Sequence, residues 1–267
     1  MGDTIRVLDL NIWNYNEPWE RRREAIISLI LDARPDVVAL QEVRYQSWQE
    51  DPRHQADQIA AGLPGYHLIW HPAHHWPTDA DSGQAQHWEG LAILSLHPFT
   101  DLAVARLSQD FSDPRDHFQR LVLAGQVRTP QGPFWLFNTH FPLSAPARDR
   151  VAIESIQFVT QIAGDLPFVF TGDLNAEPQD WPVRFLTGQV DVQGQHSPLS
   201  DAWVELHPDQ PGYTYSAWEP RQRIDYVLVP PMVQVKQMKV VGSVSGPQTI
   251  SASDHCGLLA TVDIGPR

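Results

Sequence analysis

Short apolar runs that end in polar residues recur along most of the chain. Residues 166–170 predict a short buried strand, which Thr171-Gly172 ends just before Asp173 and Asn175. At strand spacing these two polar side chains point the same way. A carboxylate beside a carboxamide suits a phosphate oxygen held next to a divalent cation, although both residue types are also ordinary in turns.

The same pattern predicts most of the secondary structure. We expect strands over 5–12, 37–40, 66–70, 91–96, 121–127, 134–139, 166–170, 223–229, 233–241 and 256–262. Helical spacing of apolar residues predicts helices over 19–33, 55–61 and 148–162. Loops are expected over 71–88 and 109–119, and a loop with a short helix over 179–200.

Strands outnumber helices, so we expect two packed β-sheets with helices on their outer faces. The pattern contains no linker, low-complexity tract or repeat of fixed period. We therefore interpret residues 1–267 as one domain.

Polar residues that suit a catalytic site stand at the ends of the predicted strands. If those ends converge, they form an acidic cleft with two histidines, in which the carboxylates repel one another unless a cation lies among them. Oxygen ligands favour Mg²⁺ or Mn²⁺ over Zn²⁺, and such a metal would polarise a phosphate ester. These residues are Asn11, Glu42, Glu89, His140, Asp173, Asn175, Asp225, Asp254 and His255.

The predicted loop over 71–88 is rich in histidine and tryptophan. A zinc site is conceivable there, but the histidine spacing matches no common ligand pattern. We favour an exposed loop in which Trp76 and Trp88 could form part of a substrate wall.

Composition narrows the possible partners and location. The net charge of −13 argues against binding long duplex DNA by electrostatics alone. Cys256 is the only cysteine, so no intrachain disulfide can form. The sequence shows neither a secretory signal nor a run long enough to cross a bilayer, and we expect a monomer in the cytoplasm.

Seven short motifs occur in an order that matches a known group of enzymes. Together they resemble the endonuclease/exonuclease/phosphatase superfamily, in particular its deoxyribonuclease I-like members. This resemblance implies an α+β fold, a four-layer α/β/β/α sandwich with two mainly antiparallel sheets. The motifs are Leu10-Asn11-Ile12, Leu40-Gln41-Glu42-Val43, Glu89-Gly90-Leu91-Ala92-Ile93-Leu94-Ser95, Asn138-Thr139-His140, Gly172-Asp173-Leu174-Asn175, Arg223-Ile224-Asp225-Tyr226 and Ser253-Asp254-His255.

The resemblance also implies a metal site and a catalytic dyad. Glu42 would be the principal Mg²⁺ ligand, with Asn11 and Asp254 beside it, and Mn²⁺ could substitute for Mg²⁺. Asp225 would orient His255, which would position or deprotonate the attacking water or contact the phosphate.

Further roles follow from the same resemblance. Asp173 and Asn175 would orient the nucleophile and hold a phosphoryl oxygen. His140, paired with Glu89, would contact the phosphate or protonate the leaving oxygen. Two arginines are candidates for substrate binding: Arg44 follows the Glu42 motif, and Arg120 either reaches a phosphate or pairs at the surface.

The resulting hypothesis is a divalent-metal-dependent phosphodiesterase, with DNA as the first expected substrate. The alternative is the same chemistry on a lipid or small-molecule phosphoester, as in sphingomyelinases. A non-catalytic binding protein is a remote third hypothesis, because every expected metal ligand is present.

Overall fold

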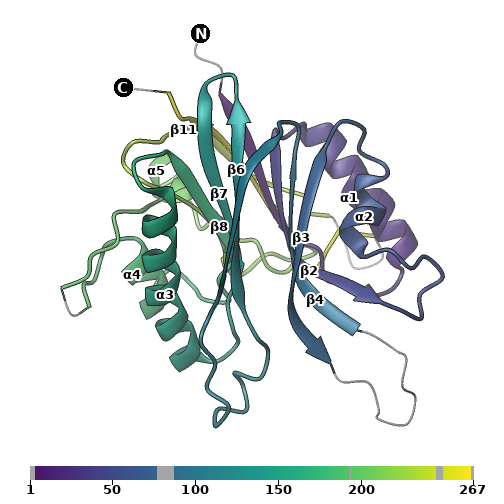
Figure 1. Ribbon diagram of the computed structural model, residues 1–267, viewed down its shortest axis with the longest axis horizontal. Helices are drawn as coiled ribbons and strands as arrows, with labels where there is room; N and C mark the ends of the chain where they lie inside the picture. Colours follow the sequence, from purple (N-terminus) through teal and green to yellow (C-terminus); the bar gives the residue numbers. More distant parts are fainter. Residues whose placement is uncertain (1–3, 77–86, 193, 245–248, 266–267) are drawn as a thin grey trace.

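The computed structural model describes residues 4–76, 87–192, 194–244 and 249–265, and these residues form two six-stranded sheets packed face to face (Figure 1). Two strand pairs, β1–β2 and β7–β8, are parallel, and the other pairs are antiparallel. One sheet has the order β11 (Gln234–Val241), β12 (Gly257–Asp263), β1 (Ile5–Asn11), β2 (Val37–Gln46), β4 (His87–Ser95), β3 (His67–Trp76). The other has the order β5 (Phe99–Arg106), β6 (Leu121–Thr129), β7 (Gly132–His140), β8 (Phe168–Asp173), β10 (Asp225–Val229), β9 (Ser200–Asp201).

Helices cover the outer faces of the sheets, which confirms the expected four-layer α/β/β/α sandwich (Figure 1). The helices α1 (Trp19–Ala33) and α2 (Gln55–Ala60) lie outside the sheet that contains β1 and β2. Outside the other sheet lie α3 (Ala145–Ala163) and α4 (Trp181–Leu186), while the short α5 (Ala202–Leu206) contacts β10 and β11.

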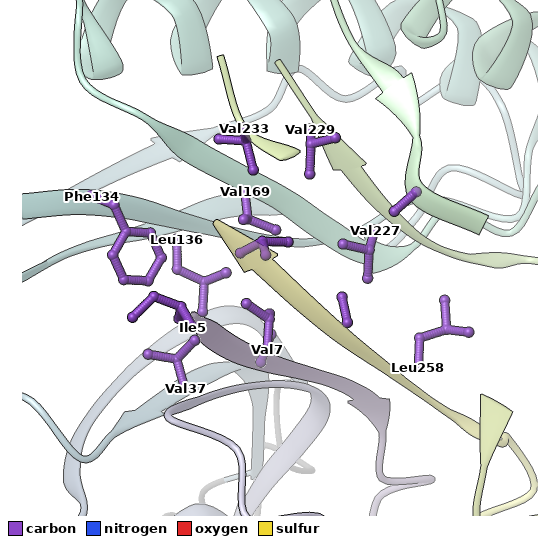
Figure 2. Close-up of a cluster of buried hydrophobic side chains, with 14 of the residues drawn as sticks. Ile5, Val7, Val37, Phe134, Leu136, Val169, Val227, Val229, Val233 and Leu258 are labelled. Carbon is purple, nitrogen blue, oxygen red and sulfur yellow. The ribbon is translucent and has the colours of Figure 1, made fainter. Parts of the chain in front are cut away.

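Apolar side chains from the inner faces of both sheets form the central core (Figure 2). Val7 and Val37 meet Phe134, Val169 and Val227 from the opposite sheet, and all five are fully buried. Burying one such side chain contributes about 1.5–3 kcal/mol. This core fixes the two sheets against each other, and so it sets where their strand ends meet.

Local signals place the two long helices as the sequence predicts. In α1, Ile26 and Ile30 are buried, and the helix ends at Arg34, which has a left-handed backbone (φ 48°) and donates its N–H to the Ile30 carbonyl. In α3, the Ser144 hydroxyl accepts a hydrogen bond from the Ala147 N–H and caps the first turn.

Two parts of the sequence-based prediction were wrong or incomplete. Residues 71–76 are not a loop but the continuation of β3, and 87–88 begin β4, because these segments pair with each other across the sheet; residues 77–86 lie outside the described part of the chain. The edge strand β5 was missed, because its half-exposed residues lack a clear apolar alternation.

Among the helices of the described segments, none is long and apolar enough to span a bilayer.

Candidate active site

The predicted site residues come together at one end of the two sheets, around a cleft of about 500 Å³. Asn11 and Asp225 are buried beneath it and contact side chains that line it. The structure thus brings the whole predicted set to one place. The predicted residues that line the cleft are Glu42, Arg44, Glu89, Arg120, His140, Asp173, Asn175, Asp254 and His255.

Three of these side chains stand in one row across neighbouring strands. His140 at the end of β7 is in register with Asp173 on β8, and Asp173 is in register with Asp225 on β10. Gly172 makes this close pairing possible: its φ is +150°, and a Cβ there would lie 2.0 Å from the Thr139 carbonyl oxygen. We call His140, Asp173, Asp225 and the adjoining His255 the floor of the cleft.

Asp225 and His255 form a buried dyad. His255 Nδ1 lies 3.1 and 3.0 Å from the two Asp225 carboxylate oxygens. Burial alone would lower the pKa of His255, but the charge and hydrogen bond of Asp225, together with Asp173 and Asp254, outweigh it and raise the pKa to about 10. The other ring nitrogen, Nε2, lies 3.8 Å from Asp173 and 4.0 Å from Asp254. The dyad therefore directs one nitrogen of His255 towards the cleft.

Asp173 lies between the two histidines. Its Oδ2 accepts a hydrogen bond from Asn11 Nδ2 at 3.0 Å, and its Oδ1 accepts one from the Asn175 N–H at 2.8 Å. His140 Nε2 is 3.5 Å from the same Oδ2. Burial, followed by repulsion from Asp225, raises the pKa of Asp173 to about 7. This carboxyl group can therefore hold or release a proton near neutral pH.

His140 is held by Arg120 rather than by Glu89. Arg120 Nη1 donates to His140 Nδ1 at 2.9 Å, so in the neutral ring Nε2 carries the proton and faces Asp173. Burial and the Arg120 charge lower the pKa of His140 well below its usual value. Glu89 binds Arg44 at 2.7 Å and lies 3.9 Å from Arg120. The expected pairing of Glu89 with His140 is thus indirect, because Arg120 stands between them.

A β-bulge turns Glu42 into the cleft. The pairing of β2 with β4 shifts by one residue between Leu40 and Val43, and Glu42 has a left-handed backbone (φ 56°). Asn11 and Asn14 donate to its two carboxylate oxygens at 3.2 and 2.7 Å. A non-glycine residue in this conformation is strained, and such strain is typical of functional positions.

A buried polar network, for which the sequence predicts no role, supports the bulge from the opposite sheet. Asn138 Nδ2 donates to the carbonyls of Leu40 and Ala92 at 2.9 and 3.0 Å, and its Oδ1 accepts from Gln41 Nε2 at 2.7 Å. Gln41 also donates to Asp9 at 2.8 Å. The sequence does carry a signal for this network, because its polar residues stand within otherwise apolar strands. Asn138 satisfies two backbone carbonyls beside the bulge that positions Glu42.

The donor atoms fit a hard divalent cation. Ligand atoms of Asp173, Asp225 and His255 all lie within 4.8 Å of one another and could hold an ion, a set that differs from the Glu42, Asn11 and Asp254 expected from the sequence. Burial raises the pKa of Asp254 to about 6, and its neighbour Glu42 adds to that rise. Carboxylates crowded in this way are stabilised by a cation, and oxygen-rich ligand sets suit Mg²⁺ or Mn²⁺.

The sides of the cleft carry aromatic residues. Trp76 and Phe118 form one side, which we call the aromatic wall, and Trp13 and Tyr215 also line the cleft. Trp88, the other tryptophan proposed for a substrate wall, instead lines a separate pocket with Trp70.

Comparisons with known proteins show the family and the fold of this chain. A model of the Endonuclease/Exonuclease/phosphatase family matches residues 10–255. Nocturnin of Drosophila melanogaster is 26% identical over 322 residues, which cover 99% of this chain and 47% of that protein, so the chain spans about half the length of this relative.

Solved structures share the fold at low sequence identity. The endonuclease/exonuclease/phosphatase of Beutenbergia cavernae DSM 12333 superimposes with a TM-score of 0.76 at 23% identity, over 98% of this chain and 72% of that one. D. rerio TDP2, complexed with a single-strand DNA product, gives a TM-score of 0.73 at 17% identity, over 98% and 99% of the two chains.

Proposed function

Because the chain belongs to the endonuclease/exonuclease/phosphatase family, we propose that it hydrolyses a phosphoester with the help of Mg²⁺, for which Mn²⁺ could substitute. Glu42 and Asp254, with Asn11 beside them, would hold the cation. Once bound, the metal would neutralise phosphate charge and so reduce the repulsion that an incoming nucleophile meets.

The observation that carries this proposal is the position of Asp173 between His140 and His255. In-line displacement at phosphorus needs one group near the attacking water and another near the leaving oxygen. Two histidines from different strands can meet that need. His255, oriented by Asp225 and protonated at neutral pH because of its raised pKa, would position the water or contact the phosphate. His140, with its proton on Nε2, would donate a hydrogen bond to the phosphate or the leaving oxygen.

Asp173 and Asn175 are the remaining members of the proposed catalytic set. The Asn175 side chain donates to the Phe141 carbonyl at 3.0 Å, which fixes its amide at the edge of the cleft. Asp173, with its pKa near 7, would orient the water together with His255. Arg44 and Arg120 would contact phosphate oxygens from the side of the cleft that also holds Glu89.

For the substrate we place a small phosphoester first, and DNA, the substrate expected from sequence, second. Carboxylates outnumber arginines along the cleft, and the whole chain carries a net charge of −13. Long nucleic acids are held mainly by cationic side chains along the backbone. The specific observation in favour of DNA is the similarity in fold to TDP2, which is known in complex with a single-strand DNA product.

The test is hydrolysis of plasmid DNA, short oligonucleotides and small phosphate mono- and diesters, each with Mg²⁺, Mn²⁺ or EDTA. We expect turnover that needs the metal and is lost in the His255→Ala variant. Metal-independent turnover, or none on the whole panel, would contradict the proposal.

A further inference from the structure

The aromatic wall lies directly beside the floor of the cleft. Arg120 connects the two, because it donates to His140 and its guanidinium carbon lies 5.8 Å from the centre of the Phe118 ring. Trp76 and Phe118 are 5.4 Å apart, and both rings border the cleft. A group attached to a phosphate that contacts His140 would therefore meet these rings.

Neighbouring rings hold the wall in place. Trp76 stacks on His87 at 4.3 Å and contacts His74 edge-on at 4.5 Å. His74 also packs against Phe118 at 4.9 Å. Burial lowers the pKa of both His74 and His87 to about 4, so these rings are neutral at pH 7 and add no charge to the wall. The wall is thus a supported aromatic surface rather than two isolated exposed rings.

We propose that this wall binds a planar heteroaromatic ring of the substrate, so that the substrate is a small nucleotide phosphoester. This inference rests on the proposed phosphoesterase function and names its substrate class. A base can stack on the planar guanidinium groups of Arg44 and Arg120, which lie over the two rings of the wall, while the phosphate reaches the floor. A cleft of about 500 Å³ lies within the range of pockets that hold molecules of this size.

The charges on the wall disfavour a choline lipid. A quaternary ammonium group needs the free face of an aromatic ring. Here the Arg44 guanidinium lies 4.9 Å from the centre of the Trp76 ring, and Arg120 lies over Phe118. These cations would repel a choline headgroup, whereas a neutral base or a phosphate is compatible with them.

The distribution of cations disfavours a long polymer. Within the described segments, Arg44 and Arg120 are the Arg or Lys side chains that line the cleft, and both pair with Glu89. The chain has two lysines, Lys236 and Lys239, and both lie on the edge strand β11. The cleft has cations for one or two phosphates but no row of them along which a nucleic acid backbone could lie.

The test compares matched substrates that differ in the base alone. Adenosine 5′-phosphate is compared with ribose 5-phosphate, and their methyl esters provide the same comparison for a diester. With Mg²⁺, we expect the base to raise kcat/KM by about 5- to 150-fold, the range given by base–aromatic stacking. Binding of the two monoesters in EDTA, measured by calorimetry, should show the same preference without turnover.

Variants of the wall test whether its two rings cause the preference for the base-bearing ester. Trp76→Leu and Phe118→Leu should each lower the ratio between the base-bearing and the base-free ester. Trp48→Leu is the matched control, because Trp48 also contacts the His87 ring, at 5.5 Å, but does not line the cleft. It should leave the ratio unchanged.

Several results would overturn the inference. They are equal hydrolysis and equal binding of the two esters by the wild type, a ratio that survives in both wall variants, or faster hydrolysis of sphingomyelin or plasmid DNA. Failure of the proposed function is a separate result, since it means no metal-dependent turnover of any ester. In that case the calorimetric preference for the base still decides whether the wall binds a ring.

Discussion

The floor and the aromatic wall border the same cleft but are built differently. The floor side chains stand on or beside central strands, are almost fully buried, and are held by hydrogen bonds and ion pairs, as His255 is by Asp225 at 3.0 Å. The wall lies at the end of β3 and in the segment 109–119, and its rings are half-buried and held by contacts of 4–6 Å. Directional contacts fix one geometry, whereas ring contacts tolerate substitution. With this difference, substitutions in the wall can change which substrate is bound while the floor keeps the same reaction.

The largest expected effect comes from the floor. His255→Ala should lower kcat by about 10²- to 10³-fold, because a positioned donor that stabilises charge in the transition state contributes that much. His196→Ala is the control, since His196 also pairs with a carboxylate, Asp191 at 2.8 Å, but at an exposed site outside the cleft. Steady-state kinetics, with circular dichroism to verify folding, measure the effect. Equal activity in the two variants would show that His255 has no part in the reaction.

The next largest effect should come from the buried polar network of Asn138 and Gln41 beside the bulge. Asn138→Leu leaves the carbonyls of Leu40 and Ala92 and one Gln41 contact unsatisfied in the core, at about 1–3 kcal/mol each, so unfolding should become easier by at least about 3 kcal/mol. Denaturant unfolding measures this. Ser197→Ala is the control, because it removes two buried hydrogen bonds away from the cleft, one to the Leu186 carbonyl and one from the Leu199 N–H, and should cost about 1–2 kcal/mol.

Asn138→Leu should also weaken Mg²⁺ binding, because Asn138 supports the bulge that turns Glu42 towards the cleft. Calorimetric titration with Mg²⁺ tests this on the folded variant. If Mg²⁺ affinity equals that of the wild type, the network stabilises the sheets without positioning Glu42.

The sequence predicted the floor better than the wall for a physical reason. Asp173 and His255 are polar residues next to an apolar strand. This pattern is local, so it can be recognised in the sequence without knowledge of the fold. The link between Arg120 and His140 joins residues 20 apart, one just before β6 and the other at the end of β7, and only the pairing of these two strands reveals it. Trp76 was placed in a loop, because a mixed His, Trp and Pro segment has no alternation and becomes a strand only through its pairing with β4.

A moderate effect is expected from pH in the metal-free protein. His255 has a folded-state pKa raised to about 10, against about 6.5 when unfolded, so its charge stabilises the fold fully below pH 6.5. That stabilisation is lost as pH rises towards 10. In EDTA, the free energy of unfolding should fall by up to about 1.4 kcal/mol per pH unit between pH 7 and 8.5.

Other ionisable groups titrate near the lower end of this pH range. Asp254 titrates at about 6 when folded, so its effect is largely complete by pH 7, and His140 acts mainly below its unfolded pKa of about 6.5. Asp173 titrates at about 7 when folded and therefore adds a smaller fall in the same direction up to about pH 8. His255→Ala should reduce the fall of the free energy of unfolding with pH. Denaturant unfolding at pH 7, 7.75 and 8.5 measures it, and an undiminished slope between pH 7.75 and 8.5 in His255→Ala would assign it to another group.

The smallest effect is expected at the junction of the floor and the wall. Arg44→Gln removes the ion pair with Glu89 and the cation over Trp76, but Arg120 remains beside Glu89. Since Arg44 is partly exposed, stability should change by no more than about 1 kcal/mol. KM should rise by about 3- to 10-fold, because one charged contact to a phosphate is lost. Arg44→Lys keeps the charge and should fall between the wild type and Arg44→Gln. If Arg44→Gln instead lowered kcat as far as His255→Ala does, Arg44 would belong to the chemistry of the floor and the two regions would not be separable.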